Sequence, residues 1–249
     1  MEENNIQAVL FDLGETLLNF GRVDTAALFR ESGRLSYDYL RQEDQPVGSF
    51  KRYLCQNLFK LYYKRLIAGI TENDFDSLAV LKNQGHKMGI KLSQQQWEHF
   101  NWLWYEPLYK KASTEPRISE TLTTLTHAGI KLGIISNTFV NACSLDKHLA
   151  AENLLGFFDI RLYSYQYGFR KPDRRIFLEA ARMIGVSPPN IMFVGDRIDK
   201  DVKGALNAGM LPVMKTAFTN NGKSPPDGTI KIERIAELPS LIEKINCQK

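Results

Sequence analysis

Three short, largely apolar runs constrain the fold of this chain more than any other feature. They cover residues 8–11, 131–135 and 191–194. Each run is continuous rather than alternating, as is typical of a strand buried on both faces of a parallel sheet. Weaker stretches at 158–163 and 211–214 predict two further strands. Because helical patterns separate these stretches, the sequence predicts right-handed βαβ units and an α/β fold with helices on both faces of a parallel sheet.

A long helical segment interrupts this alternation after the first strand. Its apolar side chains recur at helical spacing, and we find no strand pattern in it. Helix-start signals, a Thr or Ser followed three residues later by Asp or Gln, occur at Thr71 and Ser93. We therefore expect two units, an α/β core formed by residues 1–19 and 113–249 and an all-helical cap inserted between them, residues 20–112.

The composition excludes several classes of protein. With 249 residues, 43% hydrophobic and 24% charged, the chain lies near the globular average, which excludes a fibrous or disordered protein. A scattered net charge of +4 leads us to expect neither a nucleic-acid nor a membrane partner. No stretch reaches the roughly 18 apolar residues of a membrane span, and the first apolar run is too short for a signal peptide. Three widely spaced cysteines predict no disulfide framework or zinc site, so we expect a cytoplasmic protein.

Polar side chains follow several of the predicted strands at the point where each strand ends. Asp12 follows the first strand, Ser136 the second and Asp196 the strand at 191–194, while Lys171 lies in a loop before a predicted helix. Ligands of open parallel sheets bind beyond the carboxyl ends of the strands. We therefore expect these four side chains to form one site.

Two carboxylates, a hydroxyl and an ammonium suit phosphoryl transfer. A carboxylate such as Asp12 can attack phosphorus and form an acyl phosphate. Two anions about 4 Å apart repel each other by about 4 kcal/mol at an effective dielectric constant near 20, so a cation must offset that repulsion. Mg²⁺ prefers oxygen ligands, which Asp12 and Asp196 can supply. Lys171 can neutralise phosphate charge, Ser136 can donate to a phosphate oxygen, and Asp201 can orient metal-bound water from outside the ligand sphere.

Four segments of the chain resemble the four motifs of the haloacid dehalogenase superfamily, in their order and separations. They are residues 11–17, 135–137, 168–173 and 195–201. The helical insertion resembles the cap that this superfamily carries just after its first motif, the C1-type cap. The resemblance covers nearly the whole chain and implies a Rossmann-like core with an inserted all-helical cap.

The resemblance also implies roles for individual residues. Asp12 corresponds to the nucleophile. The phosphate-binding residues implied are Ser136, Asn137 and Lys171, and the Mg²⁺ ligands implied are Asp12, Asp196 and the backbone carbonyl of Gly14. Together with the chemistry above, this predicts a Mg²⁺-dependent phosphohydrolase that acts on a small phosphorylated metabolite through an aspartyl-phosphate on Asp12. The sequence fixes neither the substrate nor the oligomeric state.

Gly14 departs from the pattern of the superfamily's phosphatases, which usually carry a second Asp there as acid and base. Loss of this acid and base can lower the rate roughly 10²- to 10⁴-fold. Either another group such as Glu15 or a cap residue supplies the proton, or the substrate has a good leaving group, or the protein is a slow or non-catalytic phosphate-binding or interaction module. A 2-haloacid dehalogenase is a further alternative. That branch attacks carbon without Mg²⁺, and its first motif, Asp-x-Tyr, is lacking here.

Overall fold

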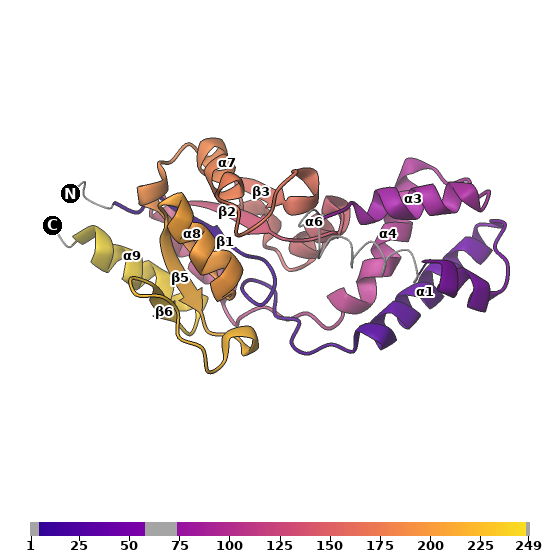
Figure 1. Ribbon diagram of the computed structural model, residues 1–249, viewed down its shortest axis with the longest axis horizontal. Helices are drawn as coiled ribbons and strands as arrows, with labels where there is room; N and C mark the ends of the chain where they lie inside the picture. Colours follow the sequence, from indigo (N-terminus) through magenta and orange to yellow (C-terminus); the bar gives the residue numbers. More distant parts are fainter. Residues whose placement is uncertain (1–4, 58–73, 248–249) are drawn as a thin grey trace.

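In the computed structural model, which describes residues 5–57 and 74–247, the chain forms one parallel sheet with helices on both of its faces (Figure 1). Within these residues the sheet has six strands in the order β3-β2-β1-β4-β5-β6. The strands are β1 Ala8–Phe11, β2 Lys131–Ser136, β3 Ile160–Tyr163, β4 Ile191–Gly195, β5 Leu211–Lys215 and β6 Ile230–Ile232. Since β1 pairs with β2 on one side and with β4 on the other, the topology reverses at β1. Ligands of such sheets bind at this reversal.

The register of the central strands aligns their carboxyl ends. Phe11 at the end of β1 lies opposite Ile134 of β2 and Val194 of β4. The backbone N–H of Asp12 then donates to the carbonyl of Val194 at 2.8 Å. The polar residues that follow these strands therefore emerge at the same edge of the sheet.

Alternate residues of β1 face the two helical layers. Val9 and Phe11 belong to one apolar cluster, which includes residues of α5, α6 and α9, and Ala8 and Leu10 to another, which includes residues of α7 and α8. All four side chains are fully buried, which accounts for the continuous apolar run in the sequence. The helices cover Ile118–His127 (α5), Ala142–Ala151 (α6), Arg174–Ile184 (α7), Lys203–Ala208 (α8) and Leu238–Cys247 (α9).

A separate group of helices lies beyond the carboxyl ends of the strands (Figure 1). In the described part of the chain it includes α1 Thr25–Gln42, α3 Ser77–Lys87 and α4 Gln94–Tyr109, and residues 50–57 are also helical. Ser93 begins α4 through a capping box with Gln96, as the sequence predicts. The side chain of Asp76 caps α3, whereas the helix start predicted at Thr71 lies outside the described residues. These helices share an apolar cluster of their own, which includes Leu40, Leu81 and Trp97.

The chain leaves for this helical group and returns from it at one point. Asn19 and Ser113 form an antiparallel bridge in which each backbone N–H donates to the other residue's carbonyl, at 2.7 and 2.9 Å. The two ends of the intervening segment therefore lie side by side, the geometry that an insertion requires.

The structure differs from the sequence expectation at the edge of the sheet. Five strands were predicted, and β6 is an additional three-residue edge strand in the part of the chain that is described. Its central residue, Lys231, is exposed and only Ile232 is fully buried, so its apolar signal is weak. Among the described residues, no helix has both the length and the apolarity to cross a membrane.

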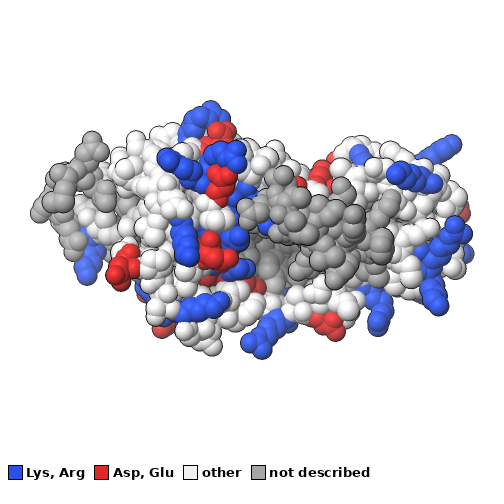
Figure 2. Space-filling view, in the orientation of Figure 1, with Lys and Arg blue, Asp and Glu red and all other residues white. Residues whose placement is uncertain are grey.

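Charged side chains do not gather by sign on the face shown in Figure 2. Lys and Arg side chains are spread along the whole molecule, and Asp and Glu side chains lie among them. This distribution agrees with the small net charge of +4.

Candidate active site

The polar residues at the strand ends meet in one cavity of about 370 Å³. It lies beyond β1, β2 and β4, and α4 contributes Tyr105 and Leu108 to its wall. The structure brings together every site residue that the sequence predicted, Asp12, Gly14, Ser136, Asn137, Lys171, Asp196 and Asp201.

A buried lysine pairs with two carboxylates at the base of this cavity. The Nζ atom of Lys171 lies 2.6 Å from Oδ1 of Asp12 and 2.7 Å from Oδ1 of Asp201. Lys171 and Asp201 are each 1% exposed, and Asp12 is 8% exposed. Burial of such charges is costly unless they are paired. The two ion pairs therefore fix the position of the Asp12 carboxylate.

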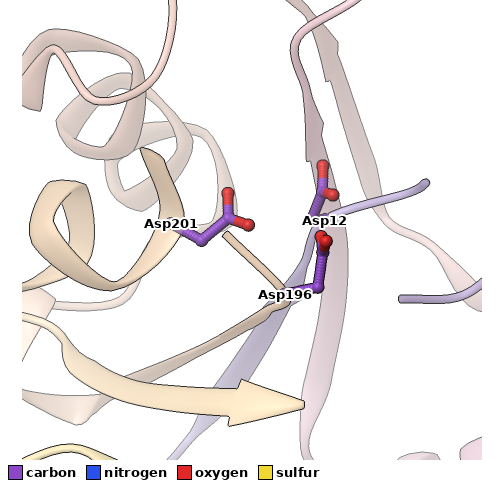
Figure 3. Close-up of side chains that lie close together, drawn as sticks. All are labelled: Asp12, Asp196 and Asp201. Carbon is purple, nitrogen blue, oxygen red and sulfur yellow. The ribbon is translucent and has the colours of Figure 1, made fainter. Parts of the chain in front are cut away.

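Asp196 adds a third carboxylate to this cluster. Single oxygens of Asp12, Asp196 and Asp201 all lie within 4.8 Å of one another. Figure 3 shows Asp12 and Asp196 beside each other, with the carboxyl group of Asp201 turned toward them. Three carboxylates thus share the positive charge of Lys171.

This excess of negative charge perturbs the titration of the cluster. Burial raises the pKa of Asp12, an effect that Lys171 opposes and Asp196 reinforces. Burial and the charge of Asp201 likewise raise the pKa of Asp196. Burial raises the pKa of Asp201 to about 6 despite the ion pair with Lys171. The protein environment alone therefore does not compensate these charges, and an additional cation would stabilise the ionised cluster.

The residues present fit a hard divalent cation. Their donor atoms are all oxygens, which suits Mg²⁺. Asp201 is already engaged through both oxygens, by Lys171 at Oδ1 and by the backbone N–H of Arg197 at Oδ2, 2.9 Å away. Asp12 and Asp196 are therefore the better direct ligands, and Asp201 is placed to act from outside the ligand sphere.

The position of Asp201 depends on Gly195 at the end of β4. Asp201 lies in a wide π-helical turn, Ile198–Val202, that precedes α8, rather than at the start of that helix as the sequence predicted. A Cβ atom on Gly195 would lie 2.5 Å from the carboxyl group of Asp201. Only glycine leaves room for this approach.

Asn137 acts on the loop that carries the lysine. Its Nδ2 donates to the carbonyl of Lys171 at 2.7 Å, and its Oδ1 accepts from the backbone N–H of Lys171 at 2.9 Å. These two bonds hold the backbone of Lys171 against the end of β2, which also places Ser136 on the cavity wall. Asn137 thus positions the lysine, whatever further contact it makes with a ligand.

Glu15 stabilises the turn that follows Asp12. Its backbone is left-handed, with a φ of 57°. Its Oε1 accepts hydrogen bonds from the backbone N–H groups of Phe20 and Gly21, at 2.9 and 3.0 Å. This carboxylate therefore has a structural role at the point where the chain turns toward α1.

Three residues that contribute to the site, Thr219, Asn220 and Arg170, were not predicted from the sequence. The hydroxyl of Thr219 donates to Oδ2 of Asp196, and Nδ2 of Asn220 donates to the carbonyl of Asp196 at 2.8 Å. Both residues lie in a stretch whose sequence predicts a loop, and the burial of Asn220 is seen only in the structure. Arg170 lines the cavity, and its guanidinium group pairs with the carboxylate of Asp74 at 3.0 Å. The two residues are 96 positions apart, and no sequence motif predicts this contact.

Most residues of this site lie in a segment that matches a known protein family. The model of the family described as haloacid dehalogenase-like hydrolase matches residues 6–209, which include every site residue that the sequence predicted but neither Thr219 nor Asn220. The chain belongs to the haloacid dehalogenase-like hydrolase family. The matched residues contain the helical insertion together with most of the sheet.

Curated relatives of this chain include several phosphatases. Glyceraldehyde 3-phosphate phosphatase of Methanopyrus kandleri is 39% identical over 136 residues, 52% of this chain and 57% of that protein. A second protein of that name, from Methanothermobacter thermautotrophicus, matches over 43% of its length, so the chain spans about half the length of these two relatives. Human N-acylneuraminate-9-phosphatase is 24% identical over 98% of this chain and 97% of its own.

Solved structures of the same fold include proteins of two activities. A phosphatase from Thermococcus onnurineus matches with a TM-score of 0.59 and 24% identity, over 95% of this chain and 98% of that one. A 2-haloacid dehalogenase from Pseudomonas syringae matches with a TM-score of 0.61 and 23% identity, over 96% and 99%. At these identities the likeness shows the shared fold, and the site must decide between the chemistries.

Proposed function

We propose that this hydrolase is a Mg²⁺-dependent phosphohydrolase that removes phosphate from a small phosphorylated metabolite, with Asp12 as the nucleophile. The observation that carries the proposal is the buried cluster of three carboxylates around Lys171 at the point where the sheet topology reverses. Such a cluster needs a cation, and a bound phosphate monoester would add to that need. The names of the phosphatase relatives support the same reaction class.

The chain's own residues account for the first step. A carboxylate oxygen of Asp12 attacks phosphorus, an O–P bond forms, and the bond between phosphorus and the leaving oxygen breaks with its electron pair on that oxygen. Lys171 holds the Asp12 carboxylate and offsets the charge of the phosphate, while Ser136 donates to a phosphate oxygen. Bound Mg²⁺ would screen the repulsion between Asp12 and the phosphate. Water then cleaves the aspartyl-phosphate and regenerates Asp12.

We propose that residues 20–112 act as a cap over this chemistry. Tyr105 and Leu108 of α4 already form part of the cavity wall. The leaving group of a substrate bound at Asp12 would therefore contact this helical group, which can exclude water and select the substrate.

The site favours this function over the two alternatives. Dehalogenation attacks carbon and needs no divalent cation, so it gives no role to Asp196 beside Asp12. A passive phosphate-binding module gives no reason to bury an aspartate carboxylate against a lysine at the centre of the cavity. The glycine at position 14 removes the usual acid but leaves the nucleophile, Asp12, in place.

Hydrolysis of p-nitrophenyl phosphate tests the proposal. We expect phosphate release that requires Mg²⁺, that Asp12→Asn abolishes, and that Glu15→Gln, which retains the oxygen that closes the turn, leaves near the wild-type rate. Fluoride release from fluoroacetate without metal would identify a dehalogenase instead. The absence of turnover in all of these assays would favour the passive module.

A further inference from the structure

The described wall of the catalytic cavity offers no carboxylic acid that is free to protonate a departing alcohol. Asp12, Asp196 and Asp201 form the cluster around Lys171, and Glu15 is bonded to two backbone N–H groups. Each of these carboxylates therefore already has a role that fixes it in place.

The remaining proton donors of the described wall are poorly suited to the task. Burial raises the pKa of Tyr105, whose hydroxyl lies 2.8 Å from Nδ1 of His148. The guanidinium groups of Arg170 and Arg197 do not release protons in proteins. The ammonium group of Lys200 also lies on the described wall, and the Lys200→Met variant tests it.

Gly14 contributes no acid to the cavity wall, although its surroundings would accept a side chain. A Cβ atom there would lie 3.7 Å from the ring of Phe20, an ordinary contact, and the residue is not in the left-handed region. Neither packing nor backbone conformation therefore requires glycine at this position. Its effect is to keep the wall next to Asp12 free of an acid.

A second hollow of about 330 Å³ adjoins the catalytic cavity. The two share Tyr105, Leu108 and Val140 as walls. No charged side chain lines the described part of the second hollow, whose wall is mainly apolar and includes Val23, Leu28, Phe29, Leu81, Trp104 and Phe139.

Three polar side chains of this hollow, those of Ser32, Ser77 and Asn101, bond to protein groups. Ser32 donates to the carbonyl of Trp104 at 2.9 Å, and Ser77 donates to Oδ1 of Asn101 at 2.9 Å. Asn101 in turn donates to Ser144 at 2.7 Å. The hollow therefore suits an uncharged, apolar group next to the reacting phosphate.

We propose that the preferred substrates are phosphate esters of acidic, apolar alcohols, such as aryl phosphates. The aryl group would then lie in the second hollow. This inference rests on the proposed function. When Asp12 bonds to phosphorus, the departing oxygen keeps the electron pair of the broken bond. A phenol, with a pKa of about 10, carries that charge without a proton, whereas an aliphatic alcohol, close to the value of about 15.7 for water, does not.

Phenyl and benzyl phosphate form a matched pair that tests this inference. They are similar in shape and differ in the acidity of the leaving group. With Mg²⁺ present, we expect kcat/KM to be at least about 100-fold higher for phenyl phosphate, the lower end of what a general acid contributes. Along a series of substituted phenyl phosphates, kcat/KM should also fall steadily as the pKa of the leaving phenol rises, a measurement that needs no variant.

Two sets of variants separate the missing acid from the apolar hollow. Gly14→Asp should raise the ratio of kcat/KM for benzyl phosphate to that for phenyl phosphate at least about tenfold, and Gly14→Asn should not raise it. Leu28→Trp, which fills the hollow, should lower kcat/KM for phenyl phosphate but not for the much smaller acetyl phosphate. Ala27→Trp, on the exposed side of the same helix, is its matched control and should change neither.

The possible failures are distinguishable. Equal kcat/KM for phenyl and benzyl phosphate, a flat phenyl series, or a loss confined to benzyl phosphate in Lys200→Met would overturn this inference and leave the phosphohydrolase in place. Leu28→Trp without effect on phenyl phosphate would remove the assignment of the hollow. Phenyl and p-nitrophenyl phosphate both left intact in the presence of Mg²⁺, or hydrolysed equally by Asp12→Asn, would overturn the proposed function itself.

Discussion

Acid should destabilise this protein through one buried histidine at the joint between α4 and α6. His148 of α6 is 0% exposed. Its Nδ1 pairs with the hydroxyl of Tyr105, and among the described residues its Nε2 has no hydrogen-bond partner. The ring packs against Tyr109 and Phe20, with centroids 4.8 and 6.3 Å away. A second ring proton would therefore be buried without an acceptor, and burial lowers the pKa of His148 from 6.5 to about 4.

The size of this effect follows from the two pKa values. The difference corresponds to about 3 kcal/mol of folding free energy, at 1.36 kcal/mol per pKa unit. The unfolded chain takes up the proton near pH 6.5 and the folded chain only near pH 4. The contribution is therefore fully present above pH 6.5 and is lost as the pH falls toward 4, with about 2 kcal/mol gone at pH 5.

Urea unfolding at pH 7.5 and pH 5 measures this contribution. His148→Gln retains a side-chain amide that can pair with the hydroxyl of Tyr105 and does not titrate. The difference in unfolding free energy between wild type and this variant should therefore change by about 2 kcal/mol between the two pH values. His127→Gln, at an exposed position, is the matched control and should show no such change. A difference that is the same at both pH values, or an NMR titration of His148 near pH 6.5, would refute the reasoning.

Three further predictions concern the carboxylate cluster. Lys171→Met leaves Asp12 and Asp201 without their shared cation, so urea unfolding in chelator should show a loss of about 3 to 5 kcal/mol. Gly195→Ala should displace Asp201, lower the unfolding free energy by about 1 to 3 kcal/mol and reduce kcat with p-nitrophenyl phosphate. Mg²⁺ at about 100 times its Kd should raise the unfolding free energy by about 2.7 kcal/mol, and an equal rise in Asp196→Asn would exclude that residue as a ligand.

Much of the fold could be predicted because a strand buried on both faces requires a continuous apolar run in the sequence. The strands β1 and β4 are such runs and are fully buried. The edge strand β6 has no continuous apolar run, because Lys231 at its centre faces solvent. Its existence depends on pairing with β5, which no local pattern predicts.

The candidate site was predictable to the extent that it follows the strands. Parallel strands end at a common edge, so Asp12, Ser136 and Asp196 had to meet once the sheet formed. The partners that hold them depend on tertiary placement. The donation from Thr219 to Asp196 and the bonds from Asn137 to the backbone of Lys171 join segments far apart in the chain. The turn before α8 likewise brings Asp201 to the lysine without a sequence signal beyond its spacing from Asp196.

Acid quenching during turnover tests the central claim most directly, because acyl phosphates survive in acid long enough to be mapped. Wild-type protein should be mixed with p-nitrophenyl phosphate and Mg²⁺, quenched, digested and analysed by mass spectrometry. We expect a phosphoryl group on the peptide that contains Asp12, and none in Asp12→Asn. Turnover that proceeds with Asp12 unmodified at every quench time, or with the phosphoryl group on another residue, would contradict the assignment of Asp12 as the nucleophile.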